Sequence, residues 1–224
     1  GSTGYGKTSL IMSIIQAVIN RAYVIIIDLK GIDFPYLQEH CLLAQTNEEA
    51  NLVLLALNAE FEKRKLILRK YRTRKWSDCP EEMPYIVTII DELAELNKEN
   101  MELLDRLVRL ARATGISIIA ASQRTSTSVI PGDTRSNFVA RICYKVPSPA
   151  DCRVIMGEDC GLAGEMAPIK GRAIYRFGID LLEVQSMYLG PEQAEELVLL
   201  SPERKWDIEQ RQTVKPQTKR LAPR

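Results

Sequence analysis

Short apolar runs alternate with amphipathic stretches along most of this chain. Three runs rich in β-branched residues predict buried parallel strands, at residues 23–27, 85–90 and 116–122. Apolar positions recur with helical spacing in three other stretches, residues 10–19, 47–71 and 101–113. Because strands and helices follow one another in this way, we predict an α/β domain with a mainly parallel central sheet flanked by helices.

The last third of the chain is more irregular. It predicts a strand at 138–146, a short helix at 149–156, a hairpin of 172–177 with 181–188 around Gly178, and a helix at 192–200. From about Ser201 the sequence turns polar, and residues 212–224 contain four cations and no acid. We therefore expect one domain over residues 1–200 and a polar, basic, flexible tail over residues 201–224.

Composition narrows the functional classes. With 224 residues, 46% of them hydrophobic and 26% charged, the chain has the make-up of an ordinary soluble domain. No apolar run approaches the roughly 20 residues of a membrane-spanning helix. The five cysteines are scattered without a C-x-x-C pair, so we expect neither a disulfide framework nor a zinc site, and a reducing cytosolic compartment. His40 is the only histidine, and we expect it to be structural or solvent-exposed.

The first eight residues fit the phosphate-binding pattern G-x-x-x-x-G-K-[ST]. The predicted helix follows at once, so backbone N–H groups and a helix N-terminus would point at one anion. Lys7 would add a charge for the β- and γ-phosphates of ATP, and the Thr8 hydroxyl would bind Mg²⁺. We expect nucleotide contacts from Gly1, Ser2, Thr3, Gly4, Tyr5, Gly6, Lys7, Thr8 and Ser9. The strand that usually precedes this loop is absent, so we expect the chain to be a piece of a longer protein.

Polar residues follow the predicted strands where their carboxyl ends face the ligand crevice of an open sheet. Strand 85–90 ends in Asp91 and Glu92, a pair that is costly to bury without a cation or hydrogen bonds. Beside a phosphate loop, Asp91 would hold Mg²⁺ and Glu92 would activate the attacking water. Gln123 follows the next strand and could sense the γ-phosphate. The alternative is a strand end whose acids simply face solvent.

Two other charged features have open interpretations. Asp28 and Lys30 follow strand 23–27 and would contact the phosphate region or form a mutual surface ion pair. Residues 63–75 contain eight Lys or Arg and no acid, which could bind a DNA backbone or could form a solvated helix face.

Several blocks together resemble the motor domain of FtsK/SpoIIIE-type DNA translocases, within the HerA/FtsK group of RecA-like P-loop ATPases. The matching stretches are GSTGYGKTS at 1–9, IIIDLKG at 25–31, PYIVTIIDELAEL at 84–96, LARATGISIIAASQR at 110–124 and VIPGDTRSNFVARICYKVPSPADCRVIMG at 129–157. The chain departs from the family at Thr125, where proline is usual, and around residues 164–171. No winged-helix module follows, and the compact motor looks more like versions from conjugative elements.

The resemblance implies an ATP-driven ring, usually a hexamer, that moves double-stranded DNA with ATP and Mg²⁺. Carried over by position, Lys7 and Thr8 bind ATP and Mg²⁺, Asp91 and Glu92 are the metal and catalytic acids, and Gln123 is the sensor. Arg112 falls where the family places an arginine that reaches the neighbouring subunit's site, although a helix-end salt bridge is the alternative. Secondary candidates for the same interface are Arg135, Arg141 and Arg153.

We therefore expect an ATPase that moves DNA in conjugation or chromosome segregation. The parent protein would lie at the cytoplasmic face of the membrane, attached through segments outside this chain. Two alternatives stay open: an ATPase that moves protein substrates, as in type VII secretion, and a nucleotide-dependent scaffold that does not hydrolyse ATP.

Overall fold

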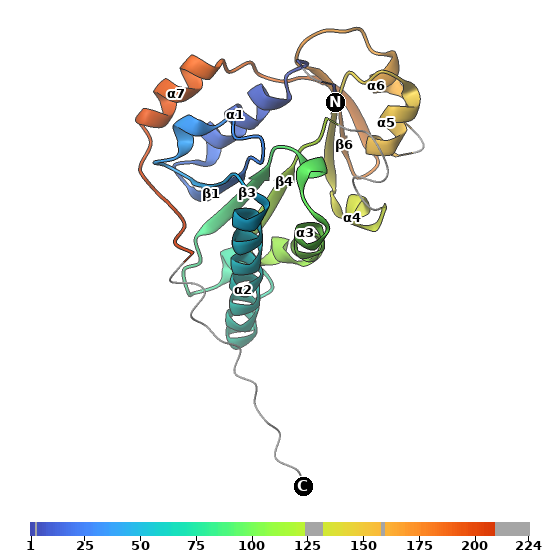
Figure 1. Ribbon diagram of the computed structural model, residues 1–224. Coiled ribbons are helices and arrows are strands. Elements are labelled where there is room, and N and C mark those ends of the chain that lie inside the picture. Colours follow the sequence, from blue (N-terminus) through green and yellow to red (C-terminus); the bar gives the residue numbers. More distant parts are fainter. Residues whose placement is uncertain (3, 124–131, 158–159, 209–224) are drawn as a thin grey trace.

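A computed structural model describes residues 1–2, 4–123, 132–157 and 160–208. It contains a four-stranded parallel sheet with the order β2-β1-β3-β4 and a three-stranded antiparallel sheet with the order β5-β6-β7. The two sheets lie side by side, and the N-terminal residue lies between them (Figure 1). The α/β architecture with a mainly parallel central sheet is thus confirmed.

The parallel sheet consists of β1 (Ala22–Ile27), β2 (Leu42–Ala44), β3 (Tyr85–Ile90) and β4 (Ile116–Ala120). The register pairs Ile27 with Ile90, and Ile90 with Ala120, so β1, β3 and β4 end at nearly the same level. Residues that follow these strands therefore meet at one edge of the sheet, as expected for parallel strands. Strand β2 has only three residues and was not predicted from the sequence.

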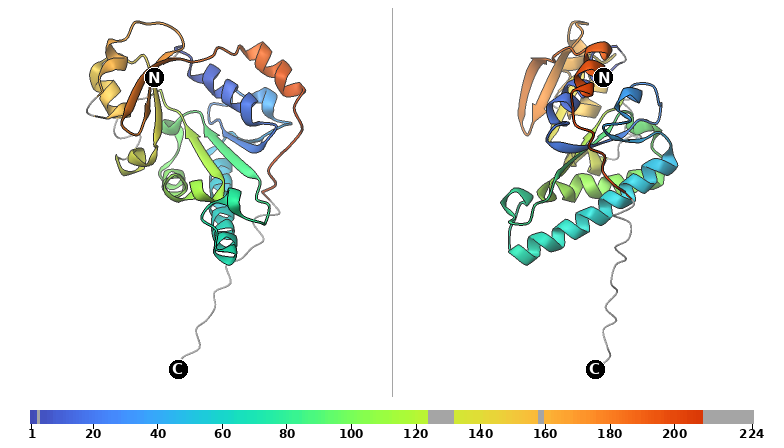
Figure 2. Two further views of the ribbon diagram at one scale, coloured as in Figure 1. Left: turned by 180° about the vertical axis from the view of Figure 1, so that it is seen from behind. Right: turned by 90° about the vertical axis from the view of Figure 1, so that its left-hand side faces the viewer.

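Helices cover both faces of the parallel sheet (Figure 2). Helices α1 (Lys7–Val18) and α7 (Pro191–Leu199) lie on one face, where Val24 and Ile26 point. Helices α2 (Asn47–Tyr71) and α3 (Lys98–Leu110) lie on the other, where Ile25 and Ile27 point. Because both faces are buried, most residues that point inward are apolar, with the buried Thr88 as an exception, and the strands appear in the sequence as largely apolar runs.

Local signals explain the helix boundaries. Thr46 and Glu49 form a capping box at the start of α2, where the Thr46 side chain accepts from the Glu49 N–H and the Glu49 side chain accepts from the Thr46 N–H. Asn97 caps α3, which begins and ends three residues before the predicted 101–113. A 3₁₀ helix, η4 (Ala111–Thr114), follows α3 directly, and Gly115 ends it in the left-handed conformation (φ 78°).

The second sheet consists of β5 (Ala140–Tyr144), β6 (Arg172–Phe177) and β7 (Asp180–Gln185). The predicted hairpin is β6–β7, with Gly178 in its turn at φ 61°. Helices α5 (Pro149–Met156) and α6 (Leu162–Glu165) pack against this sheet through a small core that includes Cys143, Cys152 and Ile174. A further helix, α4 (Gly132–Asn137), precedes β5 and was not predicted.

Part of the expected tail packs on the domain. Trp206 is 2% exposed and lies in the core between the sheet, α2 and α3, so a large indole anchors residues 201–208. The division of the chain at residue 200 stays a prediction, and residues 209–224 lie outside the described part. In that described part His40 is buried, all five cysteines are free, and no helix has the length and apolarity that crossing a membrane requires.

Candidate active site

The phosphate loop, residues 1–8, ends at the N-terminus of α1. Gly4 and Gly6 have φ values of 82° and 112°, which residues with a Cβ rarely adopt. Gly6 is the N-cap of α1, and no side chain caps that helix end among the residues that the structure describes. The amides of the first turn therefore remain available to an anion, with the helix dipole favouring negative charge. Thr3 lies outside the described residues, so its predicted nucleotide contact stays untested.

Contacts with the second sheet and the approach to α7 hold the phosphate loop. The backbone N–H of Ser2 donates to the Lys145 carbonyl at 3.0 Å, and the N–H of Gly171 donates to the Tyr5 carbonyl at 2.9 Å. The Ser9 hydroxyl makes two further contacts: it accepts from the Leu189 N–H at 2.7 Å and donates to the Leu189 carbonyl at 3.0 Å. The Ser9 hydroxyl is thus engaged in holding α1 in place, and its predicted contact with nucleotide stays a prediction.

Lys7 extends from the loop to the tip of β3. Its Nζ donates to the Asp91 carbonyl at 2.9 Å and lies 3.3 Å from Asp91 Oδ1. Asp91 is 1% exposed, and its two carboxylate oxygens have no hydrogen-bond partner in the described structure, so Lys7 supplies the compensating charge. The loop lysine and the strand-tip acid predicted from the sequence therefore share one site.

Glu92 lies beside this pair and is held by three donors. Its Oε1 accepts from the Ser122 hydroxyl at 2.5 Å and from the Ala94 N–H at 3.3 Å, and Oε2 accepts from the Gln123 N–H at 2.9 Å. Burial by itself raises the pKa of the Glu92 carboxyl, but the hydrogen bonds and the nearby Lys7 outweigh burial, and the net pKa lies below its usual value. The carboxylate is therefore kept ionised and fixed in direction.

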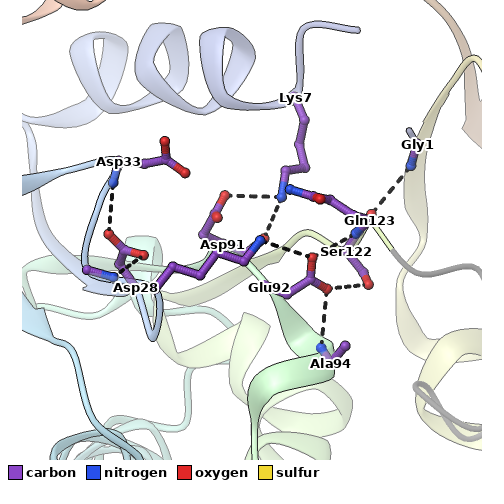
Figure 3. A network of polar contacts seen from close by, with 11 residues as sticks. Gly1, Lys7, Asp28, Asp33, Asp91, Glu92, Ala94, Ser122 and Gln123 are labelled. Atoms are coloured by element: carbon purple, nitrogen blue, oxygen red, sulfur yellow. Dashed lines mark hydrogen bonds and ion pairs between the residues drawn. The ribbon is translucent and has the colours of Figure 1, made fainter. Parts of the chain in front are cut away.

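The tip of β4 completes the group. Figure 3 shows the Gln123 side chain extending toward Lys7, while the Gln123 backbone binds Glu92. The N-terminal nitrogen of Gly1 donates to the Ser122 carbonyl at 3.4 Å, which joins the start of the phosphate loop to the same strand tip. Sequence reasoning missed Ser122, although its place directly before Gln123 at a strand end was the signal that could have found it. Arg124 and Thr125 lie outside the described residues.

Residues 28–33, between β1 and the next turn, line the opposite side of the site. Asp28 accepts from the N–H groups of Gly31 and Asp33 at 3.1 and 3.3 Å, so it organises this loop. Lys30 Nζ lies 3.7 Å from Glu92 Oε2. The alternative of a mutual Asp28–Lys30 ion pair is therefore wrong, because each side chain is engaged elsewhere.

Asp33 is a site residue that the sequence did not single out. Its carboxylate points toward Lys7 and Asp91 in Figure 3. Burial raises the pKa of Asp33, and the nearby carboxylates of Asp91 and Asp28 raise it further. The signal that could have found Asp33 is its place in the same strand-end loop as Asp28 and Lys30.

The donor set fits a hydrated Mg²⁺ bound together with a phosphate. Asp91 offers two buried carboxylate oxygens without hydrogen-bond partners, and Thr8 offers a hydroxyl in the first turn of α1. Magnesium ions in nucleotide sites usually keep several waters and take one or two protein ligands plus phosphate oxygens. In keeping with this, the described residues contain no cluster of three or more His, Cys, Asp or Glu side chains that could hold a metal by themselves.

Arg112 does not belong to this group of contacts. It lies in η4 with its side chain exposed, and among the described residues no hydrogen bond or ion pair joins it to Lys7, Asp91 or Glu92. An exposed cation that takes no part in its own subunit's site could act in another subunit. The structure describes a single subunit, so the role of Arg112 in trans stays a prediction.

The secondary arginine candidates are more engaged. Arg135 donates to the Val154 carbonyl at 2.5 Å, and Arg141 donates to the carbonyls of Phe138, Arg135 and Ile155. Both side chains stabilise the C-terminal end of α5 and its surroundings. The Arg153 side chain makes no such contact with the residues that the structure describes, and its role stays a prediction.

No family model matches the chain. In an alignment of 227 positions that covers 88% of this chain, it is 31% identical to the DNA translocase FtsK of Staphylococcus aureus strain Mu50. In an alignment of 188 positions that covers 70% of this chain, it is 33% identical to the DNA translocase FtsK of Chlamydia muridarum. A shorter match of 80 residues, 34% of the chain, is 49% identical to the DNA translocase FtsK of Rickettsia typhi.

Solved structures agree on the fold. The conjugation coupling protein TcpA of pCW3, determined with ATPγS, superposes with a TM-score of 0.82 at 24% identity, over 89% of this chain and 63% of that one. The type VII secretion ATPase EccC of Thermomonospora curvata gives a TM-score of 0.76 at 23% identity, over 91% and 28%.

The chain corresponds to only part of each of these relatives. It spans 11–28% of the length of these three FtsK relatives. The chain belongs to the FtsK/SpoIIIE-type family of RecA-like P-loop proteins.

Proposed function

We propose that this chain is the motor domain of an ATP-driven translocase for double-stranded DNA, working as a ring that is usually hexameric in this family. One observation carries the proposal. Lys7 of the phosphate loop binds Asp91 at the tip of β3, and Glu92 beside it is held by the tip of β4. The groups that bind phosphate and the groups that activate water are therefore within one site. The cargo would be the DNA of a chromosome or of a conjugative element.

Each residue has a physical role in this scheme. The amides of α1 and Lys7 bind the phosphates of ATP, while Thr8 and Asp91 hold Mg²⁺, which neutralises phosphate charge when bound. Glu92 accepts a proton from the attacking water, and its hydrogen bonds aim the carboxylate before substrate arrives. The Gln123 amide lies beside Lys7 and could report the presence of the γ-phosphate (Figure 3).

The Lys7–Asp91 contact also compensates the buried charge of Asp91. A buried carboxylate without a partner is costly, and Lys7 supplies the missing charge at 3.3 Å. Thr8 and Asp91 would hold Mg²⁺, whose charge would compensate the Asp91 carboxylate, and Lys7 would bind the phosphates of ATP.

Duplex DNA is the proposed cargo because the relatives that match most of the chain are named DNA translocases. A motor for protein substrates is the second candidate, because the fold also resembles that of a type VII secretion ATPase. The two are separated by measuring ATP hydrolysis of the full-length protein with duplex DNA or with a secreted-protein signal peptide. We expect duplex DNA to raise the turnover rate and the peptide to leave it unchanged; the reverse result would reject the DNA proposal.

Part of the basic end of α2 is the proposed DNA contact. Arg64 is 1% exposed, Lys65 pairs with Glu62 at 2.7 Å, and Lys70 lies 3.8 Å from Glu81. The view of residues 63–75 as one uniform basic surface is therefore wrong for Arg64. Six exposed cations remain: Lys63, Arg69, Lys70, Arg72, Arg74 and Lys75.

Charge reversal tests this surface. We expect Arg69→Glu, Lys70→Glu and Arg72→Glu together to weaken duplex binding and to reduce the slope of log K against log salt by up to about 3, because each lost phosphate contact removes about 0.9 from that slope. The control reverses three exposed cations elsewhere, Arg21, Lys98 and Lys205. Equal DNA affinity and equal salt slope in the two triple variants would show that residues 63–75 form a solvated helix face and do not bind DNA.

A further inference from the structure

Arg64 differs from every other cation in the basic stretch 63–75. Its side chain is 1% exposed and is among the largest fully buried side chains of the described structure. A buried guanidinium is tolerated only when its N–H groups are hydrogen-bonded and its charge is compensated. Arg64 must therefore have a role inside the fold, in contrast to the exposed cations around it.

The guanidinium joins three separate pieces of chain. Its Nε donates to Glu60 Oε1 at 2.8 Å, one turn back on α2. One terminal nitrogen donates to the Pro84 carbonyl at 2.7 Å, directly before β3, and the other donates to the carbonyls of Thr114 and Gly115 at 2.9 and 3.5 Å. Only the planar fork of arginine can reach these acceptors at once. Arg64 thus fixes the end of η4 against α2 and the start of β3.

The rest of η4 is held just as closely. The Thr114 hydroxyl donates to the Ala111 carbonyl at 2.6 Å, and the Gly115 N–H donates to the Arg112 carbonyl at 3.3 Å. Gly115 has φ 78°, and a Cβ there would lie 2.8 Å from the ring of Trp76, so this turn cannot shift toward Trp76. The backbone of Arg112 is therefore fixed on both sides, while its side chain is exposed.

We propose that Arg64 is a positioning residue for Arg112: by holding the Thr114 and Gly115 carbonyls it sets the place and direction from which Arg112 reaches the neighbouring subunit's nucleotide. The inference rests on the proposed function, in which Arg112 acts in trans. Misplacing a catalytic group by about 1 Å can lower the reaction rate roughly 100-fold, so a cation supplied by another subunit must be held on a rigid support. The buried Arg64–Glu60 pair provides that support.

Two variants test this role in the full-length protein. Arg64→Lys keeps the charge next to Glu60 but loses the fork, and the double variant Glu60→Gln, Arg64→Met removes both charges so that no lone carboxylate is buried. Lys65→Met is the matched control, because Lys65 lies next in α2, pairs with the surface acid Glu62, lies over the Phe61 ring and makes no described contact with η4. We expect both test variants to lose roughly 10- to 100-fold in kcat with ATP affinity unchanged, and the control to behave as wild type.

Mixing subunits separates positioning from simple destabilisation. A Glu92→Gln subunit cannot hydrolyse ATP itself but carries an intact Arg64 and Arg112. We expect mixtures of Arg64 variants with Glu92→Gln to hydrolyse ATP faster than either alone, because the Glu92→Gln subunit supplies a correctly placed Arg112 to its neighbour. A defect within the variant's own nucleotide site would not be restored in this way.

The outcomes identify which claim fails. Lower ATP affinity in both Arg64 variants would overturn the positioning role alone. The same conclusion would follow if mixing with Glu92→Gln restored ATP hydrolysis to Arg112→Ala but not to the Arg64 variants. Absence of recovery for Arg112→Ala as well would overturn the action of Arg112 in trans and this inference with it. A wild-type protein without ATP hydrolysis would overturn the proposed function itself.

Discussion

Glu92→Gln is expected to bind ATP as wild type does and to lose at least about 100-fold of the hydrolysis rate. The amide keeps the size of the side chain and leaves the Lys7–Asp91 contact untouched, but it cannot accept the proton of the attacking water. Lys7→Ala should show the opposite pattern, with ATP binding lost, because the phosphates lose their one side-chain cation from the loop. The measurements are equilibrium binding of a fluorescent ATP analogue and steady-state turnover.

Glu95→Gln is the matched control for this pair of variants. Glu95 lies in the short 3₁₀ helix that begins directly after Glu92, at Leu93–Glu95, and it is exposed. Its amide variant should therefore hydrolyse ATP at the wild-type rate. Hydrolysis by Glu92→Gln close to that of Glu95→Gln would reject Glu92 as the base.

Arg112→Ala is expected to lower ring ATP hydrolysis by roughly 10³-fold while ATP binding is kept, the scale found for arginines supplied between subunits. The reason is structural: Arg112 is exposed on η4 and makes no described contact with its own subunit's site, so its loss leaves that site intact. Mixing Arg112→Ala with Glu92→Gln subunits should restore turnover, since each supplies what the other lacks.

The control for Arg112 lies one turn earlier on the same segment. Arg109 is exposed and pairs with Asp105 at 2.9 Å, so Arg109→Ala removes a surface cation without altering η4. We expect Arg109→Ala to keep wild-type turnover. A loss equal to that of Arg112→Ala would mean that general surface charge, and not a specific cation, supports hydrolysis.

Much of the fold could be predicted because its elements follow local rules. Helix α2 was predicted with its observed bounds from the helical spacing of its apolar residues, and in the structure a capping box begins it. Strands β1 and β3 are buried on both faces and so stand out as apolar runs. The adjacency of Lys7, Asp91, Glu92 and Gln123 followed from parallel strands that end at one edge.

Features that depend on distant partners could not be predicted. Arg64 is one of eight similar cations in the sequence, and only the carbonyls of Pro84, Thr114 and Gly115 make it a buried residue. Strand β2 is defined by its pairing with β1 and has too few residues for a period-two signal. Trp206 was assigned to a polar tail because its neighbours in sequence are polar, whereas its burial comes from the distant residues of the core cluster on one face of the sheet.

The central claim is that ATP hydrolysis at this site drives movement along double-stranded DNA. The direct measurement is displacement of a third strand bound to duplex DNA by the full-length protein, with ATP, with the slowly hydrolysed analogue ATPγS, and with Glu92→Gln in place of wild type. We predict displacement only by the wild-type protein with ATP. Equal displacement by Glu92→Gln, or none by a wild-type protein that hydrolyses ATP in the presence of the duplex, would contradict the account.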